Sequence, residues 1–399
     1  MLSPAIGADP PQFSDSQIYN SRSVTAIAPF PWISTATWLQ TVETAVNGAL
    51  APQAAKIGSA THALQGAFRW LGKQGWLHLR GGINGETLND LKMGQFRESL
   101  ARYSGALAFL QIQHQSAGAM VASSKNRPLR DKILPGLATG HCALGIGYSH
   151  LRRSPSPVTA RPVAGGYELS GTMPWVTGWG CFEGFVGAAA LEDGGSVFGL
   201  VPFTEEVVGD RLSVGKPMDL AAFRATQTVT VSFDRWFLRD DQVLYRRLPQ
   251  WIRENDRKKV LASSFFALGC TQGSLDLLQG YLSKRSEVAE TLGETIRAIV
   301  TELNQCRQVI YRHYSPAYRN DRPDGGTPLS YEEQLHWRGR AIALGLNAAN
   351  IALMTSGGAA NYQDHPAQRL SREAIVFGVT GQTSAVLRTT LQAQGIPTR

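Results

Sequence analysis

The hydrophobic pattern of this chain changes its period twice, and the two changes limit the folds that it can adopt. Apolar residues recur every three or four positions from about 35 to 137, alternate with polar ones from about 140 to 244, and return to helical spacing from about 253 onward. This order predicts an α+β protein with helices first, then strands, then more helices. At 399 residues the chain exceeds the usual size of one hydrophobic core, so several domains are expected.

The expected domain boundaries follow these changes. We expect a loose N-terminal leader over 1–34, an N-terminal helical domain over 35–138, a central β domain over 139–246 and a C-terminal domain over 253–399. The leader lacks the basic and apolar stretches of a signal peptide. The pair Pro135-Gly136 is expected to close the N-terminal helical region, because both residues interrupt helices.

The central region is rich in short strands. Residues 185–191 and 197–203 are apolar runs separated by the turn sequence EDGGS, and Val229, Val231 and Phe233 alternate with polar residues. Short strands at this spacing predict a small barrel or a sandwich, and we expect a small β-barrel. A dinucleotide-binding sheet is not expected, since no GxGxxG or GxxxxGK[ST] loop follows a strand.

The C-terminal region contains four long helical patterns. They cover residues 260–282, 292–310, 330–356 and 369–394. Helices of this length joined by short turns predict a four-helix bundle, and Gly357-Gly358 is expected to end the third helix.

The composition excludes several kinds of partner and site. The net charge of +8 arises from scattered short basic pairs without interleaved aromatic residues, so we expect no nucleic acid partner. No apolar run is long enough for a membrane span. The four cysteines are widely spaced, which indicates reduced thiols in a cytoplasmic protein and no metal site.

The segment GGYELSGTMPWVTGWG, residues 165–180, carries the clearest chemical signal. Trp175 and Thr177 lie two positions apart, directly after a strand pattern and Pro174. An indole and a hydroxyl group presented together can cover and orient a flat flavin ring. The alternative is a tryptophan packed in the β core with a threonine beside it.

Four segments in the same order resemble the acyl-CoA dehydrogenase family of flavoproteins, over most of residues 60–395. They are LPGLATG at 134–140, the Trp175 segment at 166–178, TQTVTVSFDRWFLRDDQVL at 226–244, and Gly357-Gly358 followed by Pro366, Arg369, Arg372 and Glu373.

This resemblance implies a noncovalent FAD between the central domain and the bundle. It also implies a homodimer or homotetramer, a small-molecule substrate such as a CoA thioester, and an electron acceptor or reductase. The residues that match cofactor-binding positions are Tyr148, Ser149, Trp175, Thr177, Arg285, Gly357, Gly358 and Thr383. Structural roles are the alternatives: a barrel-edge pair for Tyr148-Ser149, a helix C-terminal cation for Arg285 and a helix stop for the two glycines.

The main departure from the family concerns its catalytic glutamate. The two positions that supply this base are occupied by Gly381 and Lys259, so the catalytic residue is unknown. A lysine acts as a base only where burial lowers its pKa strongly. The nearby polar residues are expected to be surface or capping residues; they are Glu254, Asp256, Asp364 and His365.

Further departures affect the substrate more than the flavin. Arg152, Arg153 and several prolines follow Tyr148 where the family has an acidic, glycine-containing loop, and Met173 replaces a family lysine. Three functions therefore stay open. They are an FAD-dependent dehydrogenase acting on a CH–CH bond, a flavin-dependent monooxygenase or oxidase, and a flavin-binding relative without activity.

Overall fold

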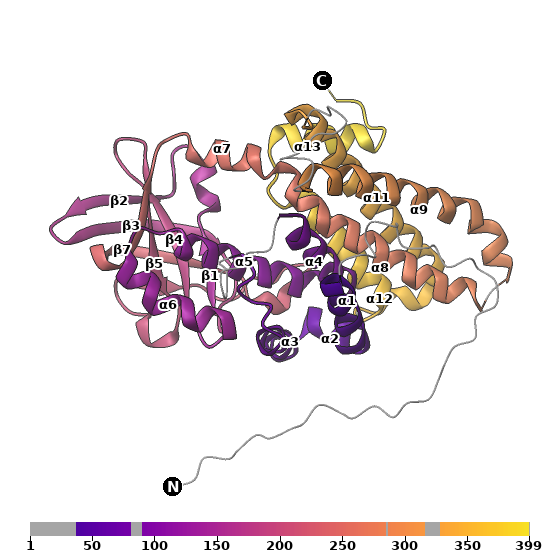
Figure 1. The fold of residues 1–399 in the computed structure, drawn as a ribbon, viewed down its shortest axis with the longest axis horizontal. Coiled ribbons are helices and arrows are strands. Elements are labelled where there is room, and N and C mark those ends of the chain that lie inside the picture. The colour runs from indigo at the N-terminus through magenta and orange to yellow at the C-terminus, as the bar shows by residue number, and fades with distance from the viewer. Residues whose placement is uncertain (1–36, 81–89, 285, 316–327, 399) are drawn as a thin grey trace, which may run out of the picture.

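The computed structural model describes residues 37–80, 90–284, 286–315 and 328–398 (Figure 1). The expected leader over 1–34 and the site residue Arg285 lie outside the described residues. The sheet occupies one end of the molecule and the long C-terminal helices occupy the other, with α4 and α5 between them (Figure 1).

The N-terminal helices follow the predicted periodicity. Ser104 divides one predicted run into two helices, because it is extended (φ −156°) and its side chain accepts a hydrogen bond from the Leu107 N–H at 3.2 Å. The expected break at Pro135-Gly136 is wrong: α6 continues to Thr139 and ends at Gly140, whose φ is +74°. The helices are α1 Thr37–Leu50, α2 Ala54–Ser59, α3 Thr61–Lys73, α4 Asp90–Tyr103, α5 Gly105–Ala122 and α6 Arg127–Thr139.

The central region forms an eight-stranded mixed sheet in the order β6-β7-β3-β2-β4-β5-β8, with β1 paired to β4. The predicted barrel is wrong, because the sheet is open: β6 pairs only with β7, and β8 pairs only with β5. β6 has three residues, too few for a second ladder across the gap. The strands are β1 Leu144–Gly147, β2 Val158–Val163, β3 Gly166–Val176, β4 Gly184–Ala190, β5 Ser196–Pro202, β6 Leu212–Val214, β7 Val229–Arg239 and β8 Val243–Arg247.

Strand β3 contains the irregularity that turns Trp175 toward solvent. The pairing of β3 with β7 shifts register between Met173 and Val176, so Pro174 and Trp175 have no ladder partner on β7. Proline has no N–H to donate to a ladder, which favours a bulge at this position. The side chain of Trp175 is 48% exposed, although Val176 beside it is fully buried.

The C-terminal helices confirm three of the four predicted helical patterns. The fourth is wrong as a single helix: it is split into α12 and α13 by residues 380–383, where Gly381 has a φ of +62°. Only glycine adopts this conformation at little cost. The elements are α7 Trp251–Lys258, the 3₁₀ turn η6 Val260–Ser263, α8 Ser264–Leu282, α9 Ser286–Tyr314, α11 Tyr331–Ser356, α12 Pro366–Val379 and α13 Ser384–Ala393.

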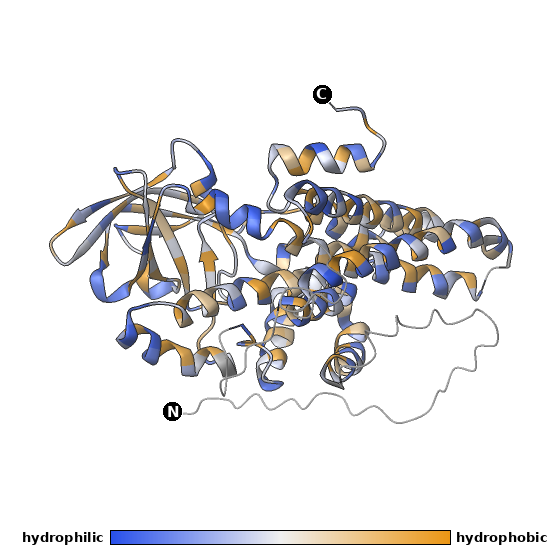
Figure 2. Ribbon diagram, turned by 45° about the horizontal axis from the view of Figure 1, so that its top comes forward, coloured by the Kyte–Doolittle hydropathy of each residue, from blue (hydrophilic) through white to orange (hydrophobic). Residues whose placement is uncertain are grey.

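Helix α11 lies at the centre of these helices. It packs along α8, α9, α12 and α13, and apolar residues gather where the long helices face one another (Figure 2). Among the described residues, the segment 331–361 is the one helical stretch long and apolar enough to cross a membrane by length and composition. Many α11 side chains are instead buried against its helical neighbours, as expected for a core helix.

Helices α4 and α8 hold the N-terminal helices against the C-terminal ones. Two glycines of α8 allow this close packing: a Cβ at Gly269 would lie 2.3 Å from the Glu98 carbonyl oxygen, and one at Gly273 would lie 2.5 Å from that of Arg102. The contact fixes α4 and the start of α8 relative to each other, and both elements line the cavity described next.

Candidate functional site

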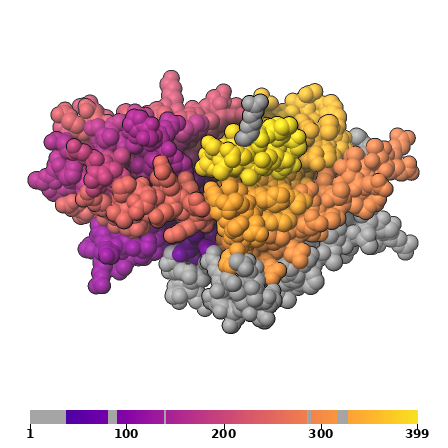
Figure 3. Space-filling model, turned by 90° about the horizontal axis from the view of Figure 1, so that it is seen from above, coloured from indigo at the N-terminus to yellow at the C-terminus, as the bar shows by residue number. Residues whose placement is uncertain are grey.

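A cavity of about 710 Å³ lies where the sheet region meets both sets of helices. On one side its walls come from the end of β1 and from α4 and α5. On the other side they come from η6, the end of α7, the start of α8, α11 and the 380–383 linker. Figure 3 shows the face of the molecule where the sheet region and α7 meet α11 and α13. The cavity therefore lies between the two parts that the resemblance places around a flavin.

Two of the predicted cofactor residues line this cavity together with both positions of the missing base. They are Tyr148, Thr383, Lys259 and Gly381. The Tyr148 ring packs edge-on against Phe198 and Trp251, with ring centroids 5.7 and 5.8 Å apart. Thr383 caps α13, because its hydroxyl oxygen accepts a hydrogen bond from the Val386 N–H at 3.3 Å.

The other predicted residues that the structure describes do not line this cavity. Ser149 follows Tyr148 and begins the short turn η2, Ser149–Arg152. Thr177 is 7% exposed, and its hydroxyl lies 3.0 Å from that of Thr228. Gly357 and Gly358 follow the end of α11, and no atom lies within 4 Å of a Cβ built on either. Whether these residues contact a cofactor stays a prediction.

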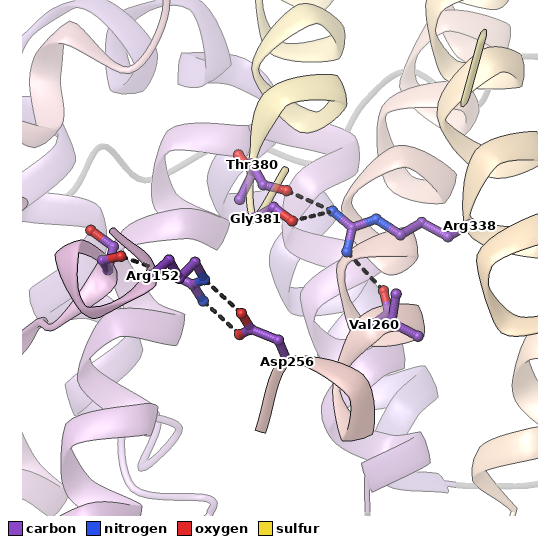
Figure 4. A network of polar contacts seen from close by, with 7 residues as sticks. Arg152, Asp256, Val260, Arg338, Thr380 and Gly381 are labelled. Atoms are coloured by element: carbon purple, nitrogen blue, oxygen red, sulfur yellow. Dashed lines mark hydrogen bonds and ion pairs between the residues drawn. The ribbon is translucent and has the colours of Figure 1, made fainter. Parts of the chain in front are cut away.

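An ion pair joins the sheet region to α7 at the edge of the cavity (Figure 4). The Arg152 guanidinium donates two hydrogen bonds to Asp256, each 2.7 Å long. Asp256, which was predicted to be a surface or capping residue, is partly exposed, and its carboxylate is held in this ion pair. Glu254 and Asp364 are exposed as predicted, and His365 caps α12 by accepting a hydrogen bond from the Ala367 N–H at 3.2 Å.

Arg338, which the sequence analysis missed, fastens the 380–383 linker to η6. Its guanidinium donates hydrogen bonds to the carbonyl oxygens of Val260 at 2.9 Å, Thr380 at 2.6 Å and Gly381 at 3.4 Å (Figure 4). Burial lowers the pKa of Arg338 to about 10, so it stays charged at neutral pH. The one available signal was an arginine within the apolar face of α11.

Lys259 lines the cavity and has a shifted pKa. Burial lowers the pKa of Lys259 to about 8, and Arg80 contributes in the same direction. Asp90 and Asp256 oppose the shift. Near pH 8 the lysine is therefore a mixture of amine and ammonium, and the amine can accept a proton.

The cavity is strongly basic. Seven arginine and lysine side chains line it, against two aspartates. Both aspartates are ion-paired, Asp90 to Arg80 at 3.5 Å and Asp256 to Arg152. The described part of the chain thus places no unpaired carboxylate on the cavity, and it holds no cluster of three metal-ligating side chains. The arrangement can bind anions, and Lys259 is its candidate proton acceptor.

Comparison with known proteins identifies the fold. No protein-family profile matches the chain. The mitochondrial isovaleryl-CoA dehydrogenase of Oryza sativa subsp. japonica is 21% identical over 360 residues, covering 85% of each chain. Butyryl-CoA dehydrogenase from Megasphaera elsdenii superimposes with a TM-score of 0.72 at 14% identity, over 90% of this chain and 96% of the other. KijD3 in complex with FMN and a dTDP-linked amino-keto sugar superimposes with a TM-score of 0.71 at 19% identity, over 91% of this chain and 95% of the other.

The molecule therefore has the architecture of a flavoprotein class in which a sheet region packs against N-terminal and C-terminal helices. That architecture is the acyl-CoA dehydrogenase fold, and the chain resembles the acyl-CoA dehydrogenase family, as its four ordered sequence segments indicated.

Proposed function

We propose that the chain is a flavin-dependent oxidoreductase that uses the cavity between sheet and helices for its reaction. The observation that carries the proposal is the convergence of Tyr148, Lys259, Gly381 and Thr383 on one cavity from three separate stretches of sequence. The resemblance implies that the positions of Tyr148 and Thr383 contact the cofactor. It also implies that the positions of Lys259 and Gly381 are those that supply the base in the family. A shared cavity is what a cofactor and a substrate that react together require.

A flavin suits the residues present. The indole of Trp175 exposes half of its surface at the end of a buried strand, which leaves an apolar face for a flat ring. Open space surrounds Gly357 and Gly358. The basic cavity favours a cofactor that carries phosphate. FAD is the cofactor that the resemblance implies, and the KijD3 structure supports FMN as the alternative.

As the default reaction we propose oxidation of a CH–CH bond in an acyl thioester or related substrate. A bound flavin would accept the hydride that leaves the β-carbon. The α-proton needs an acceptor within the cavity, and our candidate is the Lys259 amine, because it occupies one of the two base positions of the resemblance and both aspartates are held in ion pairs. The product would be the α,β-unsaturated thioester.

The absence of an unpaired carboxylate on the described cavity walls favours a second candidate. In a flavin-dependent monooxygenase or oxidase, reduced flavin reacts with oxygen and no α-proton base is needed. A flavin-binding relative without activity is the third reading. The dTDP-sugar of KijD3 supports substrates other than CoA thioesters on this fold.

Purified full-length protein separates these functions. We expect a yellow preparation whose extracted cofactor is FAD. Anaerobic mixing with a panel of acyl-CoAs should bleach the flavin if the default reaction holds. Bleaching only by NAD(P)H or a reductase, followed by rapid reoxidation in air, would establish the second candidate. A colourless protein that takes up neither FAD nor FMN would contradict all three readings.

The pH dependence of bleaching tests Lys259. The folded-state pKa of about 8 lies below the ordinary lysine value of about 10.4. The amine therefore forms as the pH rises through 8, and the bleaching rate should rise with it. In Lys259→Met we expect a rate at least tenfold lower without this rising limb, measured by anaerobic stopped-flow absorbance.

A stability measurement provides the control for this variant. Below pH 8 the folded protein carries the unfavourable charge of Lys259, and this cost disappears as the pH rises from about 8 to 10.4. Lys259→Met should thus be more stable than the parent below pH 8 and equal to it near pH 10.5 in urea unfolding. Lys132→Met, on the exposed face of α6, should match the parent throughout. A rising limb that persists in Lys259→Met would exclude the lysine as the base.

A further inference from the structure

Arg97 is a buried cation that forms no ion pair with the described residues. It is 7% exposed and lies on α4 within the cavity wall. One guanidinium nitrogen, Nη1, donates a hydrogen bond of 2.5 Å to the Ala262 carbonyl oxygen, and the buried Nε has no partner. Glu98 beside it is occupied by Arg307 and the Tyr311 hydroxyl.

The walls around Arg97 are apolar. Its guanidinium lies over the Phe266 ring, 5.1 Å from the centroid. The Phe265 ring packs directly against the backbone at Gly94, one turn earlier on α4. Only glycine leaves room for it, because a Cβ at this position would lie 2.1 Å from the ring. The remaining apolar lining at this end comes from Met93 and from Phe109 and Ile112 of α5. We call this part of the cavity the Arg97 slot; its wall is largely aromatic and aliphatic, and Arg80 and Asp90 are the charged groups closest to Arg97.

The buried charge of Arg97 is costly unless something neutralises it. A buried arginine loses the hydrogen bonds that it makes to water. Without a carboxylate partner, a single hydrogen bond to a backbone carbonyl does not compensate for this loss. Burial lowers the pKa of Arg97 to about 10, with Arg80 acting in the same direction, so the side chain still carries its charge at neutral pH. Its charged neighbours are Arg80 and Asp90, and the structure pairs these two with each other.

We propose that the Arg97 slot binds the anionic end of the substrate, an organic acid whose short apolar body lies between the rings of Phe265 and Phe266 and the α5 side chains. The inference rests on the proposed function and adds its substrate class. The apolar walls select a short hydrocarbon body, and the guanidinium selects a terminal carboxylate or a comparable small anion.

A matched pair of small molecules tests this assignment in the flavin-loaded full chain. Hexanoate carries the anion, and hexanamide has the same chain length without charge. We expect hexanoate to bind at least tenfold more tightly, measured by isothermal titration calorimetry. In Arg97→Met the preference should fall below threefold, and in Lys132→Met it should stay at the parent value. Equal affinity of the parent for both compounds, or an unchanged preference in Arg97→Met, would overturn the proposal.

Arg97→Gln is the second variant, because an amide keeps hydrogen-bond donors on this side chain without the charge. It should also lose the preference, while its flavin content stays at the parent level. A flavin content that falls in both Arg97 variants would instead assign the anion to the cofactor phosphate and contradict a substrate role. If the proposed function itself is wrong, the parent protein contains no flavin. This outcome differs from every result expected for the Arg97 variants of a flavin-loaded parent.

Discussion

Replacing Arg338 with methionine is expected to lower the free energy of unfolding by about 3 kcal/mol or more. Three carbonyl oxygens, of Val260, Thr380 and Gly381, would lose the donor that they share. Arg338 is 3% exposed and lines the cavity, so water would replace only part of the hydrogen bonding that the guanidinium supplies. Each buried acceptor left without a partner costs about 1–3 kcal/mol.

The same substitution should also impair the site. The 380–383 linker carries Gly381 and Thr383, which both line the cavity, and Arg338 holds this linker against η6. We therefore expect Arg338→Met to reduce flavin occupancy at temperatures where the protein is still folded. Urea unfolding gives the stability, and the absorbance ratio of flavin to protein gives the occupancy.

Arg340→Met is the matched control. Arg340 lies two residues further along α11 and pairs with Glu302 at 2.9 Å, where both side chains are partly exposed. An ion pair of this kind contributes about 1 kcal/mol or less. If Arg338→Met lost no more stability than Arg340→Met, the three hydrogen bonds would not fasten the linker.

The elements could be predicted from the sequence where the hydrophobic period alone decides them. The helical patterns of α1, α3 and α8 and the β4–β5 hairpin are confirmed for this reason. The breaks at Ser104 and Gly381 could not be predicted from periodicity, because the pattern continues across both and a cap or a positive φ interrupts it. Whether the sheet closes depends on pairing between its edge strands, which the spacing of strands along the chain does not specify.

The site could be predicted only in part. The resemblance selected Tyr148, Thr383, Lys259 and Gly381, and the structure places all four on one cavity. Arg97 could not be found, because only the three-dimensional structure shows that the nearby carboxylates of Asp90 and Glu98 pair with other arginines. The Arg152–Asp256 pair joins residues 104 positions apart, and no local pattern indicates it.

Replacing Trp175 with alanine should remove the flavin without unfolding the protein. The indole is 48% exposed and lies in the bulge of β3, so its removal leaves no buried hole. If the ring covers one face of a flavin, as the resemblance implies, flavin affinity should fall at least tenfold, equivalent to about 1.4 kcal/mol. Fluorescence titration of the flavin-free protein with FAD measures this change, and circular dichroism confirms the fold.

Thr177→Ala and Trp236→Ala separate a flavin contact from a general effect on the sheet. Thr177→Ala leaves the Thr228 hydroxyl with a partner only at 3.4 Å, so a stability loss of about 1 kcal/mol should accompany weaker flavin binding. Trp236 lies on β7, where its ring packs against Phe233, and its removal should lower stability while flavin affinity stays within twofold. Unchanged flavin affinity in both Trp175→Ala and Thr177→Ala would contradict the placement, because no other described segment pairs an exposed indole with a buried hydroxyl two residues later.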